Sequence, residues 1–330
     1  IPKRDWSSDV CSSDLSDETS SRMDPVAAAY GTKTDKFYLD ENGKVTQSFL
    51  APTYKDYLAT LRMWMEEGLI DIDMLGRTWS ATLKMTYVGQ SGVCHTGNWM
   101  IKEMLQLGQT ESADYALTPL PVLRLNDSDQ WIHTSQVQRP VTGSEGVWYI
   151  SSTCKDPVAA IRFIDFLYSE EGLTMATWGA GDLGDGTSTY VVKEDGSYTF
   201  SDWILNNPNI PYATLRDKYY LQQWTTRALD DLERIQYSLP LNQQCWDTWS
   251  YHNDDTQLLP RALGMTAEET SELAGIVNGV DTYVMEMVYK IITGEEPIEN
   301  WDAIVSRAKD LGLTRAVEIY QTAYDRYMAD

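Results

Sequence analysis

Residues 97–99, Gly-Asn-Trp, are the part of this sequence whose types and spacing are best suited to hold a ligand. The short β-like run of residues 92–96 leads directly into them. In open α/β sheets, ligands bind outside the carboxyl ends of the strands. The face of the Trp99 indole there offers a stacking surface for a sugar ring, and the Asn98 amide can hydrogen-bond hydroxyls. The alternative is that Trp99 is a core residue.

The aromatic composition favours a site that is apolar on one side and wet on the other. The chain has 12 Trp and 20 Tyr but 5 Phe, so most of its aromatic rings also carry a polar group. Such rings suit surfaces that contact both apolar and hydrated groups. The alternative is a Tyr-rich core whose hydroxyls are satisfied internally.

Five further residues place an indole or a carboxylate near a predicted strand, helix end or loop. They are Trp148, Trp178, Trp246, Asp247 and Trp249. The first two either contact the same ligand or belong to the core. Residues 246–260 are predicted to form an aromatic, polar loop, and function concentrates in loops. A carboxylate beside an indole can hold sugar hydroxyls there, and a merely solvated loop is the alternative.

No motif in the sequence indicates a catalytic centre, a metal site or a cofactor. The three His are scattered, and HExxH, GxSxG, P-loop and GxGxxG patterns are absent. Asp254 and Asp255 lack the alternating oxygen ligands of a calcium loop, so we expect a solvated acidic turn. A secreted glycoside hydrolase is the alternative function, because such enzymes use two carboxylates and acids are plentiful here. A purely structural or interaction module would explain the Trp excess less well.

Length and charge limit the possible partners. At 330 residues the chain is long enough for one large domain or two smaller ones. Its net charge of −23 argues against nucleic acid and anionic membranes, which need basic patches, and favours a neutral or cationic ligand. No apolar run reaches the length of a membrane span, and four cysteines without CxxC spacing favour neither a disulfide framework nor a zinc site.

Strand and helix patterns alternate along the chain, which predicts an α/β fold. We expect strands at 115–122 and 146–150, and a hairpin at 191–198 with an Asp-Gly turn. Thr53 with Asp56 is predicted to start a helix by a capping box, and Thr266 with Glu269 another. Further helices are expected at 100–107, from Pro157 to 168, up to Trp178, over much of 217–239, and at 301–311 and 314–327.

Residues 5–15, Asp-Trp-Ser-Ser-Asp-Val-Cys-Ser-Ser-Asp-Leu, resemble the conceptual translation of a sequencing-adapter oligonucleotide. We therefore treat residues 1–15 as non-native, expect them to pack against nothing, and place the native sequence from about Ser16 onward.

Four stretches, in order and spacing, resemble one family: the extracellular solute-binding proteins of carbohydrate ABC importers. The class is that of maltose-binding protein, and the type is the large lipoprotein of Gram-positive bacteria. The stretches are residues 42–71 (Asn-Gly-Lys-Val, then a helix ending Glu-Gly-Leu-Ile-Asp), 97–99, 150–172 and 292–327. Trp99 falls where relatives place a sugar-stacking Trp after a Gly, whereas Asn98 differs from the family pattern, so ligand identity does not carry over.

The resemblance implies a periplasmic-binding-protein-like, two-lobe hinged fold that is incomplete at its N-terminus. Residues 16–120 and 241–330 would form the larger, second lobe, 143–180 part of the first lobe, and 181–240 a connecting hairpin and helices. It also implies a monomeric, extracellular carbohydrate-binding protein that delivers its ligand to membrane permeases. The membrane would be reached through a lipid anchor that lies outside this sequence.

Overall fold

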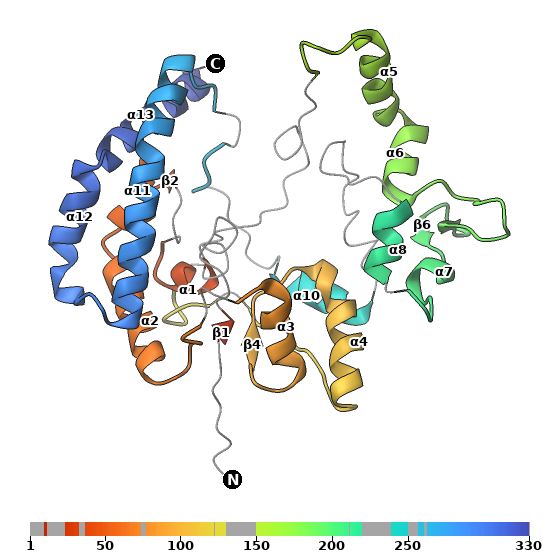
Figure 1. Cartoon of the computed structure of the whole chain (residues 1–330), viewed down its shortest axis with the longest axis horizontal. Helices are drawn as coiled ribbons and strands as arrows, with labels where there is room; N and C mark the ends of the chain where they lie inside the picture. Colours follow the sequence, from red (N-terminus) through yellow and green to blue (C-terminus); the bar gives the residue numbers. More distant parts are fainter. Residues whose placement is uncertain are drawn as a thin grey trace. The chain divides into compact units, whose positions relative to one another are not determined.

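Figure 1 shows the computed structural model of the chain. The structure describes residues 10–11, 24–32, 37–73, 77–121, 123–129, 150–210, 212–219, 239–249, 257–260 and 263–329. Contacts between residues divide the chain into two compact units. Unit 1 comprises Ile1–Gly97, Met104–Val137 and Asp247–Asp330, and unit 2 comprises Asn98–Glu103 and Gln138–Trp246.

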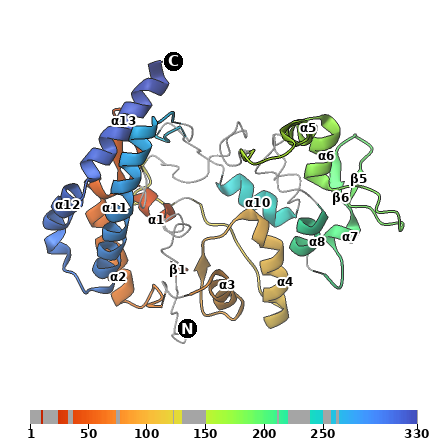
Figure 2. The same ribbon diagram turned by 45° about the horizontal axis from the view of Figure 1, so that its top comes forward.

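Unit 1 is mainly helical. Its elements are β1 (Val10–Cys11), α1 (Asp24–Ala29), β2 (Phe37–Leu39), β3 (Val45–Gln47), η2 (Ser48–Leu50), α2 (Tyr54–Glu66), α3 (Trp79–Tyr87), β4 (Val93–Cys94), most of α4 (Ile101–Glu111), α11 (Ala267–Thr293), η5 (Ile298–Asn300), α12 (Trp301–Asp310) and α13 (Leu313–Ala329). The long α11 packs against both α2 and α13, and α12 packs against α11 and α13 (Figures 1 and 2). These helices enclose the larger core, which includes fully buried Leu58, Leu61, Ile291 and Leu313.

Local sequence signals explain how α11 begins and ends. The Thr266 hydroxyl accepts a hydrogen bond from the Glu269 amide, and the Glu269 carboxylate accepts one from the Thr266 amide, which confirms the predicted capping box. Gly294 ends the helix with φ = 87°, a left-handed conformation that glycine adopts without strain. The capping box predicted for α2 is wrong, because the Thr53 side chain makes no cap hydrogen bond there.

Unit 2 combines helices with one hairpin. Its elements are η3 (Asn98–Met100), the first turn of α4, α5 (Pro157–Leu167), α6 (Glu170–Trp178), β5 (Tyr190–Val192), β6 (Tyr198–Phe200), α7 (Asp202–Leu205), α8 (Tyr212–Tyr219) and most of α10 (Pro240–Trp249). The Asp156 carboxylate caps α5 by accepting from the Ala159 amide. Antiparallel pairing of β5 with β6 confirms the predicted hairpin, with Gly196 at φ = 81° in its turn.

The described strands form three two-stranded sheets. β2 pairs antiparallel with β3, β5 with β6, and β1 pairs parallel with β4, with Val10 opposite Val93. The last pairing corrects the expectation that the residues before Ser16 contact nothing, because the backbone of Val10–Cys11 adds a second strand to β4.

Two other strand predictions have different outcomes. Residues 115–121 form no strand, because Pro119 and Pro121 lack the N–H that a strand ladder needs. The prediction at 146–150 lies outside the described residues except for Ile150, and the helix predicted at 217–239 is described for 217–219, where α8 ends, and at Leu239.

Candidate ligand-binding site

The predicted ligand-binding turn lies at the start of η3. Asn98 and Trp99 are the first two residues of this short helix, and Gly97 connects it to the segment that follows β4. The structure describes the backbone of Trp99 but not its side chain. The groups that hold Asn98 and Lys102 in place define the geometry of the turn.

Asn98 is held by a residue far away in the sequence. The Nδ2 of Asn242 donates to the backbone O of Asn98 and to its Oδ1, both at 2.8 Å. Asn98 is 5% exposed and Asn242 2%. Among the described residues the Asn98 Nδ2 has no hydrogen-bond partner, and it too is buried. In this conformation the Asn98 side chain is buried and its Oδ1 accepts from Asn242, so Asn98 has a structural role in the turn.

A second, half-buried polar group holds the segment four residues further on. The Lys102 amine donates to the backbone O of Leu205, which ends α7, and lies 5.1 Å from the centroid of the Tyr212 ring. Burial lowers the pKa of Lys102, while the carboxylate of Asp202 opposes the shift. Lys102 and Asn242 thus fasten η3 and the first turn of α4 to two different helices of unit 2.

The aromatic and acidic group at 246–249 lies on a helix, which corrects the prediction of a loop. Pro240 begins α10, a position that proline favours, and the helix runs through Trp249. Trp246 and Trp249 are half-buried and Asp247 is exposed. The prediction failed because the buried side of α10 carries Asn242 and Cys245 in place of a periodic row of large apolar residues. The rest of that expected loop is described at 257–260, without a helix or strand.

Trp178 belongs to the core of unit 2, which was the alternative to a ligand contact. It is 2% exposed and packs with Phe200, Ile204, Tyr212 and Leu215. Its ring stacks on Tyr198 with centroids 6.0 Å apart. A side chain so enclosed has no face left for a ligand. The prediction for Trp148 lies outside the described residues, as does that for Asp254 and Asp255.

Sequence reasoning missed Asn242 and Lys102. Pro240 is a helix-start signal that could have placed Asn242 in a first turn. Nothing in the sequence indicates that its amide is buried against residue 98, because that contact joins positions 144 residues apart.

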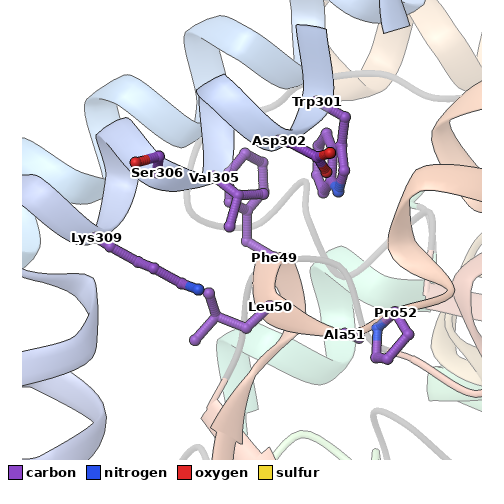
Figure 3. Close-up of a pocket in the computed structure, with 9 residues that line it drawn as sticks. All are labelled: Phe49, Leu50, Ala51, Pro52, Trp301, Asp302, Val305, Ser306 and Lys309. Atoms are coloured by element: carbon purple, nitrogen blue, oxygen red, sulfur yellow. The ribbon is translucent and has the colours of Figure 1, made fainter. Parts of the chain in front are cut away.

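A pocket in unit 1 lies between α12 and the η2 segment (Figure 3). It has a volume of about 310 Å³ and is lined by Phe49, Leu50, Ala51, Pro52, Trp301, Asp302, Val305, Ser306 and Lys309. Trp301 is 7% exposed and packs on Phe49, so its indole presents no open face for stacking. The pocket includes none of the residues predicted to bind a ligand, and we do not assign it to the site.

Within the described part of the chain, no cluster of His, Cys, Asp and Glu could hold a metal ion. Of the described helices, none is both long and apolar enough to cross a bilayer.

Comparison with known proteins relates this fold to solute-binding proteins. No protein-family model matches the chain, and no curated relative was found. Among solved structures, the alginate-binding protein AlgQ2, in a structure without calcium ion, is 25% identical with a TM-score of 0.68, over 92% of this chain and 62% of that one. The S. pneumoniae ABC-transporter substrate-binding protein FusA, in complex with kestose, is 17% identical with a TM-score of 0.69, over 97% and 63%.

A third match is the HMO-binding, ABC-transporter-associated solute-binding protein from Bifidobacterium longum infantis. It is 18% identical with a TM-score of 0.63, over 92% of this chain and 62% of that one. The chain has the two-lobe α/β fold of solute-binding proteins. It spans less than two thirds of the length of each of these three.

Proposed function

We propose that this chain is the carbohydrate-binding component of an ABC importer, which captures an oligosaccharide and delivers it to membrane permeases. The observation that carries the proposal is the match to alginate-binding AlgQ2 over 92% of the chain. FusA and the HMO-binding protein, which are named as transporter-associated binding proteins, support the same class of ligand. The ligand would contact the turn at Trp99, with Trp246, Asp247 and Trp249 of α10 as further candidates.

The location, oligomeric state, membrane anchor and lobe boundaries that we propose follow from the family resemblance. We propose that the protein acts outside the cell as a monomer, anchored to the membrane by a lipid attached outside these 330 residues. A lipoprotein of Gram-positive type fits the four sequence stretches that resemble this family. The larger lobe would correspond to residues 16–120 and 241–330, and the first lobe to a region that includes 143–180.

We also propose that residues 5–15 are not native and that the native protein is longer than this chain. The greater length of all three matched structures supports a longer protein. Helix α5 supports it as well, because the side chains of Val158 and Ile161 are 57% and 55% exposed. Apolar side chains gathered on one helix face usually pack against another element. A further segment of the protein is the partner that we expect for α5.

The alternative, a secreted glycoside hydrolase, has weaker support. It rests on the number of carboxylates. A glycosidase needs two carboxylates across a sugar site, and such pairs arise by chance in a chain with 49 acidic residues. The three matched structures are named as binding proteins and none as an enzyme.

Titration of residues 1–330 with an oligosaccharide panel tests the proposal. The panel contains neutral oligosaccharides and, as the acidic member, an alginate oligosaccharide. Calorimetry measures binding, and chromatography of the recovered sugar measures turnover. We expect neutral oligosaccharides to be preferred over the acidic one, because the net charge of −23 disfavours an acidic ligand. Binding to these 330 residues should be weak, because a cleft that lacks part of its walls buries less of the ligand, and the sugar should be recovered intact. Product formation would support the hydrolase instead.

A further inference from the structure

The contact between Asn98 and Asn242 fixes a backbone as well as a side chain. One Nδ2 group of Asn242 reaches the backbone O and the Oδ1 of Asn98, each at 2.8 Å. The peptide orientation and the rotamer of Asn98 are therefore set together by one amide. Trp99 follows directly in η3, so the path of its backbone depends on the same contact.

Burial makes this amide costly to lose. Both residues are at least nine-tenths buried, so water does not readily replace the donor that the two Asn98 oxygens share. A buried polar group left without its partner costs more than the hydrogen bond itself contributes. Without Asn242 the Asn98 peptide would turn toward water, and Trp99 would move with it.

The amide also connects two segments that carry candidate ligand contacts. Asn242 lies in the first turn of α10, and Trp246 lies one helical turn further along the same helix. Residues three and four apart lie on one side of a helix. The two hydrogen bonds from Asn242, between residues 144 positions apart, therefore fix where the turn at Trp99 lies relative to this part of α10.

We propose that Asn242 is a positioning residue for ligand binding, which acts on Trp99 through Asn98 and does not itself touch the saccharide. Asn98 is the buried acceptor in this arrangement rather than a ligand contact. The inference rests on the proposed function, because it takes Trp99 as the residue that contacts the saccharide.

Two substitutions at residue 242 test the proposal in the full chain. Asn242→Leu keeps a similar volume without a donor, and Asn242→Asp keeps the shape but turns an acceptor toward two acceptors. The matched control is Ser169→Ala in the same unit. The Ser169 hydroxyl accepts from the Gly172 amide at 3.0 Å at the start of α6. Loss of such a cap lowers stability without reaching the turn.

We expect the control and both variants to lower the melting temperature, and the residue-242 variants alone to weaken saccharide binding, by about tenfold. A second readout needs no ligand: the part of the near-ultraviolet circular dichroism that Trp99 contributes, taken as wild type minus Trp99→Phe. It should change in Asn242→Asp and stay unchanged in Ser169→Ala. If no saccharide binds the wild type, the proposed function fails, and this spectrum still decides the positioning role. Unchanged affinity and an unchanged Trp99 spectrum in a folded Asn242 variant would overturn it.

Discussion

At the scale of single residues, Gly108 allows the Tyr115 ring to lie directly against helix α4. Gly108 is buried in α4, and a Cβ added there would lie 2.2 Å from the Tyr115 ring. That ring packs edge-on against Tyr87, and its hydroxyl donates to Thr86 at 3.2 Å. The close approach therefore seats Tyr115 against both α3 and α4.

Gly108→Ala should destabilise unit 1 by about 1–3 kcal/mol, the usual cost of overpacking. Intrinsic helix propensity works in the opposite direction, by about 1 kcal/mol in favour of Ala. The control is Gly275→Ala in α11, where an added Cβ meets nothing, so that variant should gain stability. Urea denaturation of both variants measures the difference, and a stabilising Gly108→Ala would show that Tyr115 is not packed there.

Glu269 gives the stability of unit 1 a defined pH dependence. The Arg326 guanidinium donates to its carboxylate at 2.8 Å, and together with the Thr266 amide this holds the pKa of Glu269 at about 2, below its ordinary value of 4.5. A lowered pKa in the folded state adds stability above the unfolded pKa. That contribution is lost as the pH falls through the folded pKa.

Glu269→Gln should therefore lower the melting temperature near neutral pH, and the difference from wild type should shrink between about pH 4.5 and pH 2. Gln can still serve in the capping box, so the variant isolates the charge. Glu268→Gln, an exposed neighbour in the same turn, serves as the control. A melting-temperature difference that is constant across this range would contradict the assigned ion pair.

At the scale of elements, the sequence predicted best where apolar periodicity or a capping residue is present. Helices α2, α11, α12 and α13 have a buried apolar side, α5 and α11 begin at side-chain caps, and all five were expected from the sequence. Helix α10 was missed at Trp246–Trp249 because its buried side carries Asn242, which no hydrophobic pattern reports. The sequence predicted where the candidate site lies, at the turn of residues 97–99. It did not predict which residues hold that turn, because partners such as Asn242 are distant in the sequence.

Helix α5 permits a prediction of its own, because Val158 and Ile161 are exposed and Leu167 is the buried residue at its far end. Val158→Ser with Ile161→Ser should reduce self-association and the binding of a hydrophobic dye while the melting temperature changes little. Leu167→Ala, at the buried end of the same helix, is the contrasting variant and should lower the melting temperature. Light scattering and dye fluorescence measure both. A large loss of stability in the double Ser variant would mean that this face is already covered within the chain.

At the scale of the whole molecule, the fold, the net charge and the aromatic composition all favour the same class of ligand. The fold is that of solute-binding proteins, over 92% of the chain in the comparison with AlgQ2. The net charge of −23 favours a neutral ligand, and the many Trp and Tyr suit contact with sugar rings. Together these features lead to the central claim that a saccharide binds at the turn that carries Trp99.

The most direct test of that claim is calorimetric titration of the best saccharide from the panel into wild-type protein and Trp99→Ala, with melting temperatures measured on both. Stacking on an aromatic ring contributes about 0.5–1.5 kcal/mol beyond the area that it buries. We therefore predict clearly weaker binding in Trp99→Ala with little change in melting temperature. Unchanged affinity together with a large loss of melting temperature would show that Trp99 is a core residue and would contradict the account.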